Sequence, residues 1–329
     1  MLKNNFKSEN QYINYEKNND IMLTMVPLLA MSVFMYGIRP IVLVIVALLT
    51  AFVSDKIVYK CRRKKYPPKD NGSFIIALII VFLMPVTVNF NVLIISISIA
   101  IIAGRHILGG EGYYPFNPAA LGFSVAVISW TDNVIKYPVP FTKVPIFDTS
   151  MVKLVAGPAT TLSLNGLPNI TSAKLWIGEF EGGIGTTFTL ILLSCYLLLL
   201  VRKRISFLVT TSFLLSSAFF VAIFNRIPAS NILEVIKFEI FSGYVFFGAI
   251  FLLSDFTTIP KNPYSKLIYG TLLGITTMLF NFYGAFEVGI TFAILAINSI
   301  YGALDRLIEK ILLKDFKKTD KINVFKKRR

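Results

Sequence analysis

Two adjacent threonines in a short polar stretch are the first residues whose chemistry stands out. Thr160 and Thr161 follow Gly157 and Ala159 in KLVAGPATTLSLNG, a segment with no helical stripe of apolar residues. A threonine hydroxyl can be the attachment point for a group that the chain itself lacks. It can equally cap a helix in a surface loop, because Thr is a favoured N-cap residue. The residues of this segment leave both interpretations open.

Carboxylate and amide side chains beside apolar runs form a second group that could do chemistry. Asp255 ends an apolar run in SDFTTIP, where hydroxyls and a helix break accompany it. Glu111 and Asn117 lie in GGEGYYPFNPAALGF, whose glycines and prolines allow a non-helical segment that contacts a cofactor or an ion. Carboxylates at membrane depth are costly and are generally functional. We therefore take these three residues as ion-path candidates, with solvated helix ends and a plain cytoplasmic turn as the alternatives.

The composition indicates an integral membrane protein. Of the 329 residues, 55% are hydrophobic and 16% are charged, whereas soluble domains carry about 25% charged residues. The net charge of +15 falls in clusters beside apolar runs, which argues for membrane topology and against nucleic-acid binding. With two cysteines and one histidine, the chain alone cannot hold an iron–sulfur cluster or a bis-His haem, and we expect no metal site.

Apolar segments predict an all-α polytopic fold of about ten transmembrane helices. The segments are roughly 21–37, 40–54, 73–87, 90–104, 117–131, 184–201, 206–224, 239–254, 266–281 and 287–304. They divide the chain into an N-terminal segment 1–20, a first five-helix half 21–131, a long loop 132–183, a second five-helix half 184–304 and a basic tail 305–329. Because each half has an odd number of spans, we expect the two halves to have inverted orientations.

Basic residues predict the orientation in the membrane. With the N-terminus inside, the basic clusters at 56–69, 202–204 and 314–329 all lie on one face. By the positive-inside rule this face is cytoplasmic. Both termini are then expected in the cytoplasm, and the loop 132–183 outside it. The expected location is the cell membrane.

Four separated blocks of sequence carry a recognisable pattern. They are DNGSFIIALIIVFLMP, GRHILGGEGYYPFNPAALGFSVAVISW, LWIGEFEGGIGTTFTLILLSCYLLLLVRKRISF and FSGYVFFGAIFLLSDFTTIPKNPYSKLIYGTLLGI. In this order the blocks resemble the family of RnfD and its relative NqrB, the membrane subunits of the Rnf and Na⁺-translocating NADH:quinone oxidoreductase complexes. The resemblance covers about residues 20–310.

The resemblance implies a ten-helix fold related to urea-transporter-like channels and a flavin subunit in a redox-driven ion pump. In the family, a flavin transferase joins FMN by a phosphodiester to an extracytoplasmic threonine, within a motif of the form Asp-x-x-Ser/Thr-Gly-Ala-Thr. On this chain the motif falls on residues 154–160. Thr160 is therefore the expected acceptor, with Thr161 as the alternative, and a second, non-covalent flavin is a further expectation.

The motif on this chain differs from the family pattern in three places. Leu154 stands where the family has Asp, Gly157 where it has Ser or Thr, and Pro158 where it has Gly. Only the Ala-Thr pair, Ala159 and Thr160, is intact. A flavin held without a covalent bond, or no flavin, remains an alternative to FMN on Thr160.

We expect an electron-transfer subunit of an Rnf-type oxidoreductase that translocates Na⁺ or H⁺. The chain lacks a GxGxxG dinucleotide fingerprint. It is therefore not a complete enzyme alone, and we expect iron–sulfur and flavoprotein subunits, together with the flavin transferase, as partners. The alternatives are a flavin-free transporter or channel for a small solute or ion on the same scaffold, and a flavin-free structural subunit.

Overall fold

Helices make up most of the part of the chain that the structure describes. A computed structural model describes residues 2–67, 70–110, 112–227, 231–284, 288–302 and 305–306, with side chains from Tyr15 onward. Glu111, one of the ion-path candidates, lies outside the described residues. The first helix, α1 (Leu2–Tyr36), extends well beyond its predicted apolar segment into the polar N-terminal stretch.

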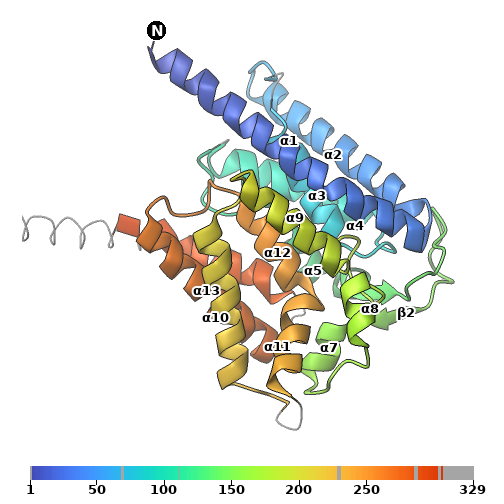
Figure 1. The fold of residues 1–329 in the computed structure, drawn as a ribbon. Helices are drawn as coiled ribbons and strands as arrows, with labels where there is room; N and C mark the ends of the chain where they lie inside the picture. The colour runs from blue at the N-terminus through green and yellow to red at the C-terminus, as the bar shows by residue number, and fades with distance from the viewer. Residues whose placement is uncertain are drawn as a thin grey trace, which may run out of the picture.

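The first half of the chain contains two long helices and three that are shorter or irregular. They are α1, α2 (Arg39–Cys61), α3 (Gly72–Leu83), α4 (Phe90–Ile99) with its π-helical continuation η1 (Ala100–Ile107), and α5 (Pro118–Ser129). Gly37 turns the chain between α1 and α2 with φ of +87°, a conformation that glycine adopts without steric cost. α1 and α2 consequently pack side by side along one edge of the molecule (Figure 1).

The connection between the halves contains short elements and no membrane-length helix. They are α6 (Thr131–Val134), β1 (Lys136–Pro138), β2 (Leu154–Ala156), α7 (Pro158–Ser163) and α8 (Ser172–Ile177). The two strands pair antiparallel, with Tyr137 opposite Val155. This small sheet is a local addition to the all-α architecture that the sequence predicts.

The second half begins with two apolar helices and continues with a broken one. They are α9 (Thr189–Val201), α10 (Phe207–Ile223), α11 (Ile232–Phe241), α12 (Tyr244–Phe251) with its 3-10 continuation η2 (Leu252–Ser254), and α13 (Pro263–Tyr283), followed by a helix over Gly289–Gly302. α10 and α13 cross closely because Gly270 and Gly274 let the backbone carbonyls of Val209 and Phe213 approach.

The helix lengths are those of a membrane protein with several incomplete spans. Tyr15–Tyr36, Arg39–Cys61 and Phe90–Ile107 are each long and apolar enough to cross a membrane. α11 and the α12–η2 helix qualify only together, as one span bent by 54°. Every predicted apolar segment contains a helix. The remaining apolar helices have 10–17 residues and are too short to qualify as spans, whereas α13 is long enough but has too low a hydropathy. The total of ten spans therefore stays a prediction.

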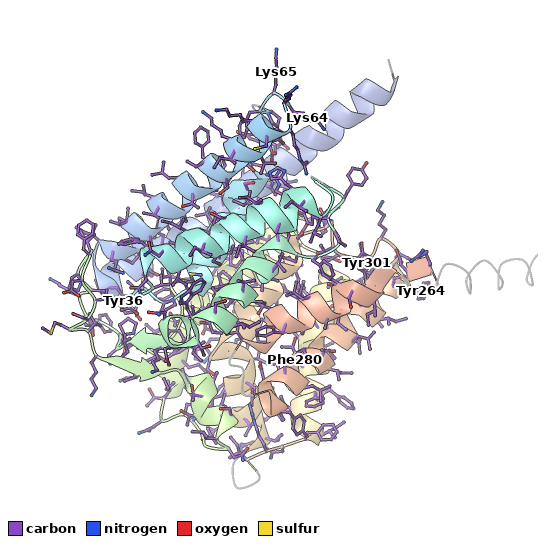
Figure 2. The ribbon with its side chains drawn as sticks, turned by 180° about the vertical axis from the view of Figure 1, so that it is seen from behind. Tyr36, Lys64, Lys65, Tyr264, Phe280 and Tyr301 are labelled. Carbon is purple, nitrogen blue, oxygen red and sulfur yellow. The ribbon has the colours of Figure 1, made fainter. Side chains whose placement is uncertain are left out.

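A basic loop and the turn between the two helices lie at opposite ends of the α1–α2 pair. Lys64 and Lys65 follow the end of α2, whereas Tyr36 lies at the turn between the two helices (Figure 2). A 23-residue helix is about 34 Å long, close to the thickness of a bilayer core of about 30 Å. Tyr36 O accepts a 3.0 Å hydrogen bond from the Val144 N–H, so the connection between the halves is fastened to the end opposite the basic loop.

Candidate functional site

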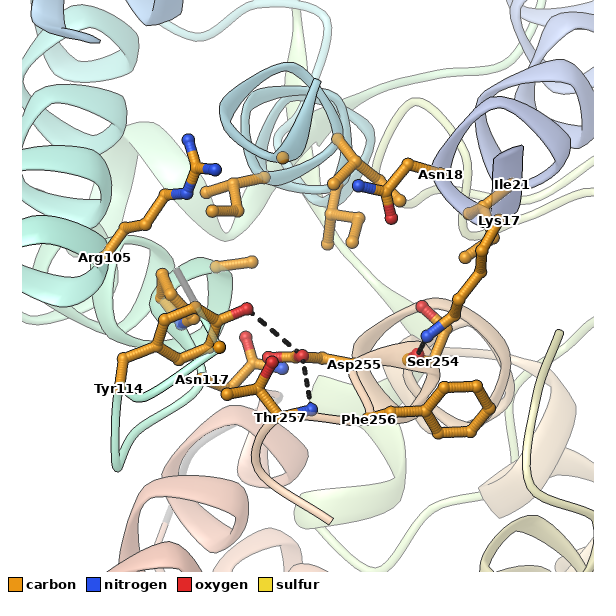
Figure 3. A pocket seen from close by; sticks show the side chains of 17 residues that line it. Lys17, Asn18, Ile21, Arg105, Tyr114, Asn117, Ser254, Asp255, Phe256 and Thr257 are labelled. Atoms are coloured by element: carbon orange, nitrogen blue, oxygen red, sulfur yellow. Dashed lines mark hydrogen bonds between the residues drawn. The ribbon is translucent and has the colours of Figure 1, made fainter. Parts of the chain in front are cut away.

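A charged pocket lies where helices from both halves end inside the molecule. It has room of about 90 Å³, enough for several water molecules or a partly hydrated ion. Its polar lining comes from α1, η1, the connector before α5 and the chain after η2, namely Lys17, Asn18, Arg105, Tyr114, Asn117 and Asp255 (Figure 3). We call it the Asp255 pocket.

Asn117 joins two helix ends at this pocket. Its Oδ1 accepts a 3.0 Å hydrogen bond from the Ala120 N–H and so caps α5, with Pro118 at the first helical position. Its Nδ2 donates to Leu252 O at 2.9 Å, in the last turn of the α12–η2 helix. The positive end of α5 and the negative end of α12–η2 therefore meet here. In transporters such discontinuous helices hold ions and substrates.

The Asp255 carboxylate is only partly satisfied. Oδ1 accepts hydrogen bonds from the Tyr114 hydroxyl at 3.2 Å and from the Thr257 N–H at 3.0 Å. Oδ2 is buried and has no hydrogen-bond partner among the described residues. Burial, and next the charge of Asp255, raise the pKa of Tyr114 well above its ordinary value, so its phenol stays a hydrogen-bond donor. One buried oxygen of this carboxylate is thus left for a ligand.

Lys17 brings a positive charge into the same pocket from α1. Its side chain is buried, at 7% exposure, and Nζ donates to Ser254 O at 2.5 Å. Nζ also lies 3.4 Å from the centroid of the Phe256 ring, within cation–π range. No carboxylate among the described residues forms an ion pair with this ammonium (Figure 3).

A buried ion-pair network adjoins the pocket through Arg105. The guanidinium of Arg105 lies 2.5 Å from Asp70 Oδ1 and 3.5 Å from Asp55 Oδ2, and it donates to the Ser73 hydroxyl. His106 Nε2 is 2.7 Å from Asp55 Oδ1. Arg105 and His106 both belong to the π-helix η1, a form that often marks functional sites.

None of the residues of this network is among the sequence-based candidates. The predicted span 40–54 ends just before Asp55, but α2 continues to Cys61 and buries that carboxylate within the helix. Two features of the sequence could have pointed to this network: the position of Asp55 directly after the apolar run, and the single histidine. No sequence feature indicates Lys17, since it lies among polar residues and contacts Ser254 only in the folded chain.

The candidate flavin loop lies away from the Asp255 pocket. β2 leads through Gly157 into α7, which carries Thr160 half-buried and Thr161 exposed. A Cβ atom on Gly157 would lie 2.9 Å from the Tyr137 ring, so a Ser or Thr at this position would displace that ring. The gap beneath the loop, to which Gly157 and Ala159 contribute, has room of about 10 Å³, far less than a flavin ring requires.

One helix connects the candidate flavin loop with the Asp255 pocket. The gap beside Gly157 is also lined by Ser242 and Gly243, at the break before α12. Just after this break, the Tyr244 hydroxyl lies 2.7 Å from that of Tyr137 in β1. The other end of the α12–η2 helix leads into Asp255. The structure thus brings Asn117 and Asp255 together on one pocket, whereas Gly157 and Ala159 line a separate small gap, and Thr160 and Thr161 are not among the residues that line it.

Helices that end inside the molecule around a buried charged pocket define a polytopic membrane protein with discontinuous spans. The chain belongs to the NQR2, RnfD, RnfE family, whose model matches residues 11–314. This match confirms the resemblance that the four sequence blocks indicate.

Proteins similar to this chain are named as components of ion-translocating complexes. It is 27% identical to the D subunit of the ion-translocating oxidoreductase complex of Actinobacillus succinogenes, over 87% of this chain and 90% of that protein. It is 26% identical to the D subunit of the proton-translocating ferredoxin:NAD(+) oxidoreductase complex of Clostridium ljungdahlii, over 88% and 89%. Identity to the D subunit of the Na(+)-translocating ferredoxin:NAD(+) oxidoreductase complex of Acetobacterium woodii is 22%, over 88% of each chain.

Proposed function

We propose that the chain is the electron-transfer membrane subunit of an Rnf-type oxidoreductase that couples redox chemistry to Na⁺ or H⁺ translocation. Family membership and the names of the relatives support this proposal, and they also support a multi-subunit assembly. The iron–sulfur and NAD-binding parts would belong to partner subunits. Electrons would reach this chain through a flavin, and the ion would pass through the Asp255 pocket.

Thr160 is the proposed attachment site for FMN, with Thr161 as the alternative. A covalent phosphodiester needs an accessible hydroxyl, and α7 offers one half-buried and one exposed threonine. Because the gap beneath the loop is so small, an attached ring would lie on the outer surface, where a partner subunit could contact it. FMN would supply stepwise electron transfer between two-electron and one-electron carriers. The residues around Thr160 would position its phosphate end.

The observation that carries the proposal is the placement of α12. Its first residue, Tyr244, contacts the sheet that leads into the flavin loop, and its 3-10 continuation ends at the Asp255 pocket. The 11 residues from Tyr244 to Ser254 span about 16 Å as a helix. A rigid element that contacts both sites can couple them if it has two positions and if the state of each site changes the equilibrium between these positions.

We further propose ten spans in two inverted five-helix halves, in the cell membrane, with both termini in the cytoplasm. In each half, the second helix packs against the fourth: α2 against α4, and α10 against α13. In each half the third span is also short or broken and leads into extended backbone, at Met84 after α3 and at Asp255 after η2. This shared pattern supports an internal repeat of five spans, and the odd number of spans in each half would give the two halves inverted orientations.

The first test is flavin fluorescence of the denatured chain, expressed with its native partners and flavin transferase. We expect a fluorescent band that Thr160→Val abolishes and Thr161→Val preserves. The matched exchange at Thr161 controls for loss of a hydroxyl in the same short helix. A dark band from an intact wild-type complex would remove covalent FMN from the proposal.

The second test addresses the ion path. Asp255→Asn keeps the size of the side chain and removes its charge, so we expect electron transfer to uncouple from ion transport in proteoliposomes. Normal pumping by this variant would refute the role of Asp255. Ion or solute flux without any redox substrate would favour the flavin-free transporter or channel, which the discontinuous helices also permit.

A further inference from the structure

The Asp255 pocket contains a positive charge that the ion-path role of Asp255 does not explain. A lysine near a membrane helix end ordinarily extends to the interface, where water solvates its ammonium. Lys17 instead points inward, and the ammonium is held by one backbone carbonyl, Ser254 O at 2.5 Å, and by the face of Phe256. Figure 3 shows its side chain reaching from α1 to the end of η2.

The other charges around the pocket are already compensated. Arg105 pairs with Asp70 and Asp55, both of which lie outside the pocket lining. Among the charged side chains that line the pocket, this leaves the carboxylate of Asp255 and the ammonium of Lys17. Among the described residues that line the pocket, the charges of Lys17 and Asp255 thus cancel each other.

We propose that the Lys17 ammonium is a tethered cation that occupies the Asp255 pocket and must leave when a mobile monovalent cation binds. The proposal rests on the ion-path function of Asp255 and adds the group that competes with the ion. The ligands suit a hard cation, since Asp255 Oδ2 and Ser254 O are both oxygens. Exchange of one ammonium for one monovalent ion leaves the charge of the pocket unchanged, whereas a divalent ion would add one positive charge.

The position of Lys17 allows the exchange without unfolding. Lys17 lies near the end of the span Tyr15–Tyr36, and its neighbours Glu16 and Asp20 line an open recess beside α1. Arg202 and Arg204 also line this recess, so the positive and negative charges of its lining cancel. Four rotatable bonds let the ammonium move from the pocket toward this recess while α1 stays in place. Departure of the ammonium frees Ser254 O, so the same carbonyl can serve lysine or the ion.

The test measures binding of ²²Na⁺ to the purified complex by equilibrium dialysis. Lys17→Met removes the competing charge and keeps an unbranched apolar chain, so we expect Na⁺ affinity to rise by about tenfold or more. Lys17→Arg retains the charge and should bind Na⁺ no more tightly than the wild type. Lys64→Met, an exposed lysine after α2, changes net charge equally and should leave the affinity unchanged.

A fourth variant separates this proposal from the ion-path role itself. If Asp255→Asn abolishes Na⁺ binding while Lys17→Met binds Na⁺ with the same affinity as the wild type, the pocket binds the ion and the tethered-cation proposal is wrong. If Asp255→Asn binds Na⁺ normally, the site lies elsewhere and both are wrong. If neither the wild type nor Lys17→Met binds Na⁺ in a complex with active electron transfer, the proposal is also overturned.

Discussion

Replacement of Arg105 by methionine isolates the contribution of the buried ion-pair network. The guanidinium lies 2.5 Å from Asp70 and 3.5 Å from Asp55, and the three side chains are at most 3% exposed. After Arg105→Met, Asp55 keeps contacts of 2.7 Å each with His106 and Ser73. Among the described residues, Asp70 keeps only the 3.0 Å hydrogen bond from the Gly72 N–H, so it becomes the less compensated of the two carboxylates.

The structure therefore predicts both a cost and a specific rescue. Removing one partner of a buried ion pair typically costs about 3–5 kcal/mol, because the remaining charge is left without compensation. We expect Arg105→Met to lower the free energy of unfolding by that amount. Arg105→Met combined with Asp70→Asn should recover about half of the loss, since the second change removes the uncompensated charge.

The measurement is unfolding of the chain in mixed lipid–detergent micelles, followed by circular dichroism during titration with a denaturing detergent. Lys136→Met is the control, because Lys136 and Asp132 form an exposed ion pair of 2.9 Å with side chains 50% and 83% exposed. Such pairs contribute at most about 1 kcal/mol. A loss for Arg105→Met no larger than for the control, or no rescue by Asp70→Asn, would refute the reasoning.

Two further predictions concern packing and the connection between the halves. Gly274→Ala should lower the free energy of unfolding by about 1–3 kcal/mol, because its Cβ would lie 2.6 Å from Phe213 O. Gly302→Ala, whose Cβ would have no atom of the described residues within 4 Å, should have no such effect in the same titration. Arg39→Met removes donors to the carbonyls of Val86, Val88 and Pro145, at 2.6–2.9 Å, so chymotrypsin should cut residues 139–151 faster, whereas Lys143→Gln, which removes a charge from the same loop without adding a chymotrypsin site, should be cut at the wild-type rate.

The arrangement of helices could be predicted because the bilayer limits what an apolar segment can form. Every predicted apolar segment contains a helix in the structure, since backbone polar groups in lipid must be paired within the segment. The ends were harder to predict. α2 passes Ser54 and buries Asp55, because the charged residues after it can still be helical at the membrane surface. Hydropathy marks where apolar residues stop and not where the helix stops.

The candidate site could be predicted only in part, because it depends on contacts between distant residues. The helix-breaking neighbours of Asp255 and Asn117 indicate both residues, and the structure places them on one pocket. Lys17 lies 237 positions from Ser254 along the chain, and no local pattern reports that contact. The close approach of the Tyr137 ring to Gly157, which leaves little space for a Cβ atom there, is likewise visible only in the fold.

The position of the pocket follows from how the end of the α12–η2 helix satisfies its backbone. A helix that ends inside the protein leaves carbonyls without intrahelical partners, and these must be paired or contact water. Here Leu252 O accepts from Asn117, and Ser254 O accepts from Lys17. A side-chain donor can be replaced by an ion or a water molecule through rotation of its bonds, whereas a donor within the helix cannot be replaced without unwinding. The tethered-cation proposal places the exchange at this last turn for that reason, since a cation would enter and leave there with little change in the fold.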